Sequence, residues 1–150
     1  MRFIFSFIIL MQSCAVLAQN NSSTSKDDLQ IIRNFVKDMV NEDIKTDVIL
    51  SQYIIVENPN DELYDYLQVS LDEVRINLWS KKIDDIRYTE YANMPRKDVR
   101  DIDIENIDPN RVYFLHYKNR QVLAVYLEQD KIASFTLVSK GDNKAHFVLY

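Results

Sequence analysis

Residues 112–138 read VYFLHYKNRQVLAVYLEQDKIASFTLV, and this stretch decides the fold class of the chain. Its side chains alternate along short runs rich in valine, tyrosine and phenylalanine, which is typical of half-buried strands. Polar pairs at Asn119-Arg120 and Gln129-Asp130 separate the runs and predict tight turns. A further turn over 139–143 holds the only glycine of the chain, Gly141. The pattern predicts an antiparallel meander with strands over 112–117, 121–127, 131–138 and 145–150.

Apolar side chains near the start of the chain recur at helical spacing and predict a helix that begins at Ser25. Asp28 falls in its first turn, where an acidic side chain suits the positive end of the helix dipole. A second, short helix is predicted over 45–53. The apolar positions of the first helix are Leu29, Ile32, Val36 and Met39.

The clearest helix signal begins at Asn58-Pro59, which predicts an asparagine cap and a proline at the first helical position. A stripe at spacings of three and four then predicts a helix buried on one side over about four turns. Its members are Tyr64, Leu67, Leu71, Val74 and Leu78, with Trp79 at the end.

The pattern changes after this helix. Residues 83–91 predict a strand that Met94-Pro95 ends, because proline favours an extended residue before it. Residues 96–110 fit either a helical turn from Lys97 or an extended edge.

Helices followed by a meander predict an α+β domain, with two to three helices packed on a curved antiparallel sheet of four to five strands. This order, over residues 26–150, resembles the nuclear transport factor two-like cone of ketosteroid isomerase and scytalone dehydratase. The resemblance implies a pocket that some members use for acid–base catalysis and others for binding. Residues 131–135 and 140–142 also resemble small exported bacterial proteins of unknown function. A cystatin-like sheet that wraps one helix is the alternative.

Residues 1–18 predict export. Arg2 precedes an almost wholly apolar run over 3–11, and Ala18 offers a small residue for cleavage, as in a secretory signal peptide. Residues 19–25 then predict a polar tether, and residues 26–150 a single periplasmic or extracellular domain. Cys14, the only cysteine, gives a second reading, in which its lipidation anchors the protein to a membrane.

Composition excludes several classes of function. The chain has 18 basic and 23 acidic side chains, which argues against a nucleic-acid partner. A single glycine leaves no phosphate-binding loop, so no cofactor is predicted. The acidic run over 101–108 lacks the glycine and the final glutamate of a calcium loop, and no metal site is predicted. No segment reaches the length of a transmembrane span.

Six side chains are candidates for chemistry or binding. His116 and Asp84 have the ionisable groups that a general base needs, and Tyr88 and Tyr113 could donate hydrogen bonds beside them. Tyr117 and His146 are the candidates for binding. Sequence alone assembles no catalytic set from them.

Three functions follow from these observations. The first is an exported, non-enzymatic binding module for a protein, a peptide or a small molecule, which the tyrosine content favours. The second is a cofactor-free isomerase, dehydratase or hydrolase with an Asp/Tyr/His pocket. The third is a structural unit that dimerises through an open sheet face.

Overall fold

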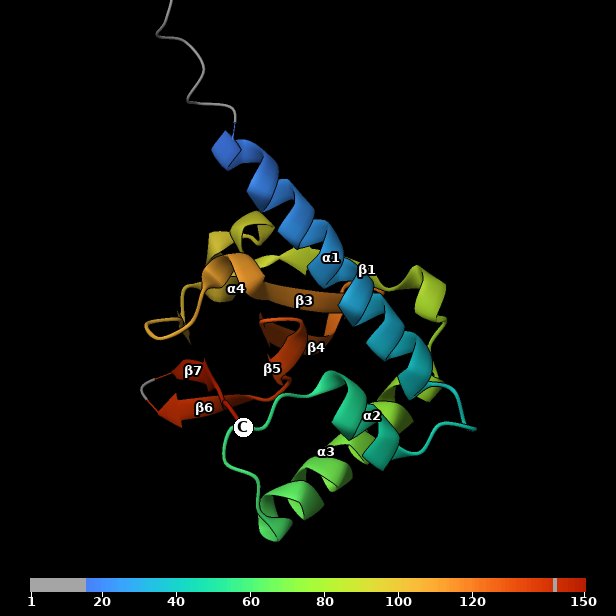
Figure 1. Ribbon diagram of the computed structural model, residues 1–150. Helices are drawn as coiled ribbons and strands as arrows, with labels where there is room; N and C mark the ends of the chain where they lie inside the picture. The colour runs from blue at the N-terminus through green and yellow to red at the C-terminus, as the bar shows by residue number, and fades with distance from the viewer. Residues whose placement is uncertain (1–15, 142) are drawn as a thin grey trace, which may run out of the picture.

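The computed structural model describes residues 16–141 and 143–150 (Figure 1). Cys14 and the apolar run of the predicted signal peptide lie outside the described residues, so export and lipidation stay predictions. Three helices precede all of the named strands, which confirms the α+β class. In chain order the elements are α1 (Val16–Met39), α2 (Thr46–Tyr53), α3 (Asp61–Trp79), η1 (Ile83–Asp85), β1 (Arg87–Glu90), η2 (Tyr91–Asn93), α4 (Arg96–Val99), β2 (Ile102–Asp103), η3 (Pro109–Arg111), β3 (Val112–Tyr117), β4 (Arg120–Glu128), β5 (Lys131–Ser134), β6 (Leu137–Gly141) and β7 (Lys144–Phe147).

Two helices begin at other residues than the sequence predicts. α1 begins at Val16 and runs through 19–25, the predicted tether, since this polar segment has neither the glycine nor the proline that would end a helix. α3 is capped by Asn60, not by Asn58, because the Asn60 side chain accepts a hydrogen bond from the Leu63 amide at 2.8 Å. Pro59 therefore lies just outside the helix instead of at its first position.

The region between α3 and the meander contains both structures that the sequence left open. The predicted strand over 83–91 is shorter, because η1 occupies its start and β1 ends at Glu90. Residues 96–110 hold the helical turn α4 and then the short strand β2.

Four strands form one antiparallel sheet in the order β1-β3-β4-β5. Tyr117 pairs with Arg120, so the hairpin turn is Lys118-Asn119 and not the predicted Asn119-Arg120. Both turn residues have positive φ, 47° and 64°, as a two-residue hairpin of this type requires. The turn at Gln129-Asp130 is confirmed by the pairing of Glu128 with Lys131.

The predicted strand over 131–138 is divided between two sheets. β5 ends at Ser134, and β6 pairs with β7 in a second sheet of order β2-β7-β6. Where the chain leaves the first sheet, the Phe135 amide donates to the Tyr150 hydroxyl at 3.2 Å, and the Ser134 hydroxyl donates to the Thr136 carbonyl. These bonds replace the sheet partners that the backbone loses there. The described strands therefore form an antiparallel sheet of four strands, as predicted, and a second sheet of three strands that the sequence does not predict.

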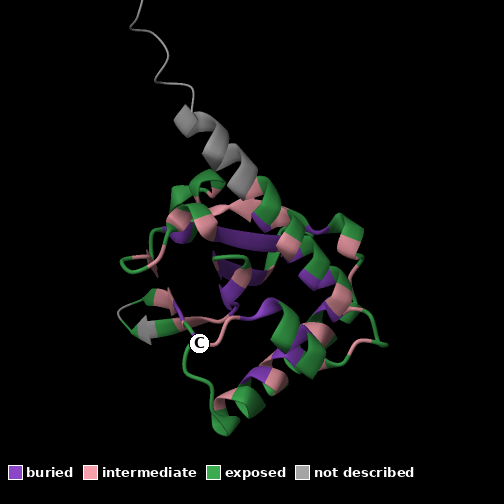
Figure 2. Cartoon of the chain, in the orientation of Figure 1, coloured by how far each residue is buried: buried purple, intermediate pink, exposed green. Residues whose placement is uncertain are grey.

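Much of β3, β4 and β5 is buried (Figure 2), and apolar clusters pack on both faces of the four-stranded sheet. On one face, Tyr113 and Leu115 join the buried sides of α1, α2 and α3 in the larger apolar cluster. On the other face, Val112 and Phe114 pack with Val99 of α4 and other side chains, including Phe147 of β7. Side chains of the described residues therefore pack on both faces of this sheet, and dimerisation through a sheet face stays a prediction. None of the helices in the described part of the chain is both long and apolar enough to cross a membrane.

Candidate functional site

A buried polar network joins α1 to the four-stranded sheet. Asp28 is only 2% exposed, and both of its carboxylate oxygens accept hydrogen bonds from Arg111, at 3.0 Å from Nε and 2.5 Å from a terminal nitrogen. The Tyr113 hydroxyl donates to the same carboxylate at 3.4 Å. One turn earlier on α1, the Ser25 hydroxyl donates to Glu90 of β1 at 2.5 Å.

This network corrects the role that the sequence gave to Asp28. Its carboxylate does not serve the helix end; it pairs with Arg111, which also donates to the Gln129 carbonyl and whose pKa the Asp28 hydrogen bonds raise. Because both carboxylate oxygens are engaged, Asp28 is placed to hold α1 on the sheet rather than to take a proton from a substrate. Sequence reasoning missed the pair, since 83 positions separate its members.

The raised pKa of Tyr113 leads us to expect that the protein loses stability at alkaline pH. Burial, together with the Asp28 and Glu90 carboxylates, raises the pKa of Tyr113 to about 12. An unfolded tyrosine titrates near about 10, so between these values the unfolded chain binds fewer protons and the free energy of unfolding falls as the pH rises. Tyr113→Phe is expected to reduce that fall by up to about 1.4 kcal/mol per pH unit. Urea unfolding at several alkaline pH values checks this, and a profile parallel to the wild type would contradict it.

His116 lies on the other face of the sheet, beside Arg87 in the neighbouring strand. It lines a shallow groove of about 390 Å³ together with Thr89, Met94 and Asp98, among others. Burial and the Arg87 guanidinium lower the pKa of His116 below its usual value. Its Nδ1 is shielded from solvent and has no hydrogen-bond partner among the described residues. The groove is open, and no tyrosine is among the described residues that line it.

Asp84 and Tyr88 lie near each other but in different surroundings. Asp84 is exposed in η1, whereas Tyr88 is half-buried in β1 and packs against the first apolar cluster. Arg33 of α1 lies over the Tyr88 ring, 5.3 Å from its centroid. Burial raises the pKa of Tyr88, Arg33 lowers it and Asp84 raises it again.

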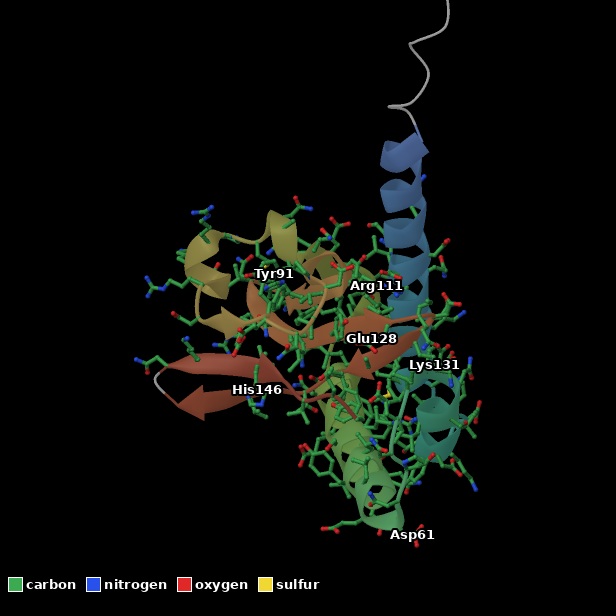
Figure 3. All side chains as sticks on the ribbon, turned by 60° about the vertical axis from the view of Figure 1, so that its left-hand side comes forward. Asp61, Tyr91, Arg111, Glu128, Lys131 and His146 are labelled. Atoms are coloured by element: carbon green, nitrogen blue, oxygen red, sulfur yellow. The ribbon has the colours of Figure 1, made fainter. Side chains whose placement is uncertain are left out.

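The two candidates for binding lie far apart in the topology. His146 is on β7 in the small sheet, in register with Val138 of β6, and Figure 3 shows it well away from Arg111 and α1. Tyr117 lines a second open groove of about 480 Å³ beside Lys81, with the Lys118 ammonium 5.3 Å from its ring centroid.

The structure does not bring the four catalytic candidates into one site. Tyr88 and Tyr113 belong to the cluster under α1, while His116 lines the groove on the opposite face and Asp84 is at the surface. Likewise, no group of three metal-ligating side chains occurs within residues 16–141 and 143–150.

A different feature stands out on α3. Four large apolar side chains, at spacings of three, seven and three, are exposed on the side of the helix that faces away from the core. We call this surface the α3 face; its members are Tyr66 (48% exposed), Val69 (60%), Ile76 (66%) and Trp79 (52%). Leu67, Leu71 and Leu78 are buried on the opposite side, as predicted. The sequence prediction was wrong about Tyr64 and Trp79, which are exposed.

A signal for the α3 face is present in the sequence. One core stripe needs only one side of a helix, yet residues 61–79 carry apolar side chains on two sides. In the sequence, Trp79 fits the buried stripe as well as the exposed one, because both stripes have helical spacing.

Carboxylates flank the two central residues of the α3 face. Glu62 and Glu73 are exposed on one side of Val69 and Ile76, and Asp65 and Asp72 are exposed on the other side. The only basic residue of α3, Arg75, turns inward and donates to the Met39 and Ile44 carbonyls at 2.9 and 2.6 Å.

The chain matches no protein-family model, no curated protein and no solved structure.

Proposed function

We propose that this protein is an exported, non-enzymatic interaction module and that a partner protein docks on the α3 face. The observation that carries the proposal is the exposure of Val69 and Ile76, 60% and 66%, on a helix whose opposite side buries Leu67, Leu71 and Leu78. An apolar row with a polar border is typical of a protein-binding surface. Burying this surface under a partner would stabilise the complex by about 25 cal/mol for each Å² of apolar area removed from water.

The aromatic residues support the same proposal. Tyr66 and Trp79 lie at the two ends of the α3 face and are exposed by about half. Tyrosine and tryptophan are enriched among the residues that contribute most to binding energy, because they bury a large area at low entropic cost. A small polar ligand would gain little from this surface, since it is convex and apolar.

The resemblance to the nuclear transport factor two-like cone, and the cystatin-like alternative, are part of this proposal. Docking on α3 needs no internal pocket, so it suits the members of that fold that bind without catalysis. Export to the periplasm or exterior is proposed from the residues that resemble a signal peptide, and it would place the partner there.

Site-specific photocrosslinking in the cells that make the protein tests the proposal. A photoreactive phenylalanine analogue at Val69 or Ile76 is expected to give one discrete covalent adduct with a second protein. The control is the same analogue at Ala92, which is exposed on η2, an element that packs on β3 and η3.

The adduct should disappear when Val69→Asp is combined with the analogue at Ile76. Equal adducts from Ala92 and Val69 would show that the contact is non-specific. The absence of any adduct from either α3 position, in a protein with wild-type circular dichroism, would refute docking on α3.

A further inference from the structure

The charges on α3 restrict the kind of partner. Acidic residues flank Val69 and Ile76 on both sides, and the one basic side chain of the helix, Arg75, is turned inward. A partner that buried this face would bring its own rim close to the carboxylates. Opposite charges there favour association, whereas like charges are unfavourable.

A second copy of the chain fits this face poorly. Packing α3 against α3 would place Asp65, Asp72 and Glu73 of one copy near the same carboxylates of the other. Lys81 and Lys82 follow the helix and lie only at its C-terminal end, so they cannot offset the acidic residues along its middle. Repulsion between the carboxylates of the two copies would oppose dimerisation through α3.

The shape of the face favours a helix as the occupant. Val69 and Ile76 lie almost in line along the axis of α3, and Tyr66 and Trp79 extend the row to about 20 Å at 1.5 Å per residue, one on each side of that line. The backbone of α3 is bonded within the helix, so it offers an extended peptide no free main-chain groups for strand pairing. A partner helix already bonds its own main chain internally, so it can bind by packing its side chains against the apolar row.

We infer that the α3 face binds an amphipathic α-helix that carries basic side chains on both sides of its apolar stripe. This inference rests on the proposed docking function of α3 and names the chemistry of its partner. The basic rims would pair with Glu62 and Glu73 on one side and with Asp65 and Asp72 on the other.

Trp79 provides a direct probe, because it is the only tryptophan of the chain and belongs to the α3 face. The test uses two synthetic helical peptides of about 20 residues, which contain no tryptophan and have the same stripe of leucine residues. One carries lysine and arginine on its rims and the other carries glutamate. Titration of the folded protein with the basic peptide should shift the Trp79 emission to shorter wavelength as water leaves the ring.

The basic peptide is expected to bind at least about tenfold more tightly than the acidic one at low salt, and its affinity should fall as salt screens the rim pairs. The double substitution Glu62→Lys with Glu73→Lys should remove most of this preference. Val69→Lys should weaken binding of the basic peptide at least about tenfold, whereas Ala92→Lys should leave it unchanged.

The other outcomes separate the two proposals. Equal binding of both peptides would overturn the charge selection and leave docking on α3 standing. Binding of neither peptide, alongside a specific crosslink from Val69, would overturn the helical partner but not the proposed function. A blue shift on concentrating the protein alone, with a doubled mass in light scattering, would identify a second copy as the occupant and overturn this inference.

Discussion

Leu71→Asp is expected to unfold the domain. Leu71 is fully buried at the centre of α3, within the apolar cluster that joins the three long helices to the sheet. An aspartate there would be buried without a charged partner, or would be protonated at a similar cost. That cost is comparable with the whole stability of a small domain, about 5–15 kcal/mol. Circular dichroism and thermal melting should show no cooperative transition at neutral pH.

Two neighbouring variants make this result specific. Leu71→Ala removes the side chain without adding charge and should cost about 2–5 kcal/mol while leaving a folded protein. Val69→Asp adds the same charge to the same helix at a position that is 60% exposed, and should change the stability by less than about 0.5 kcal/mol. If Leu71→Asp and Val69→Asp melted at similar temperatures, the assignment of the two sides of α3 would be wrong.

Asp28→Ala is expected to destabilise the protein by about 3–5 kcal/mol. The substitution leaves the Arg111 guanidinium, whose side chain is 18% exposed, without its carboxylate, and the Tyr113 hydroxyl without its acceptor. Desolvation of the unpaired charge, and not the loss of attraction alone, makes the effect large. Chemical denaturation of the two proteins at neutral pH measures the difference.

A surface ion pair provides the control for this prediction. Arg100 and Asp101 lie 3.3 Å apart, but their side chains are 72% and 57% exposed. Asp101→Ala should therefore cost less than about 1 kcal/mol. The double variant Asp28→Leu with Arg111→Met should recover most of the stability, because it removes both charges from the interior. A double variant as unstable as Asp28→Ala would contradict the unpaired charge as the cause.

Much of the local structure is predictable because short-range patterns specify it. β3, the Gln129-Asp130 turn and the buried stripe Leu67, Leu71 and Leu78 follow from alternation, turn chemistry and helical spacing. Boundaries were less predictable: Asn58 and Asn60 are both plausible caps, and only the bond to the Leu63 amide distinguishes them. Where the strand over 131–138 divides, the Tyr150 hydroxyl accepts a hydrogen bond from the Phe135 amide, and no pattern within that strand indicates this contact.

The candidate site was not predictable in the same way. The candidates for catalysis in the sheet are His116, Tyr88 and Tyr113, but alternation along β3 puts His116 on one face and Tyr113 on the other. The apolar residues of α3 were visible, yet their spacing fits burial as well as exposure. Only the packing of α1 and α2 against one side of α3 shows which stripe remains uncovered.

The α+β class, the order of three helices before the strands, and the buried stripe of Leu67, Leu71 and Leu78 follow from the sequence alone. Those properties depend on the period of hydrophobicity and on turn residues, which act over a few positions. The tertiary structure alone decided that the strands form two sheets, that Asp28 pairs with Arg111, and that Val69 and Ile76 face solvent. These depend on contacts between residues far apart in the chain, and no local pattern records which surfaces such contacts cover.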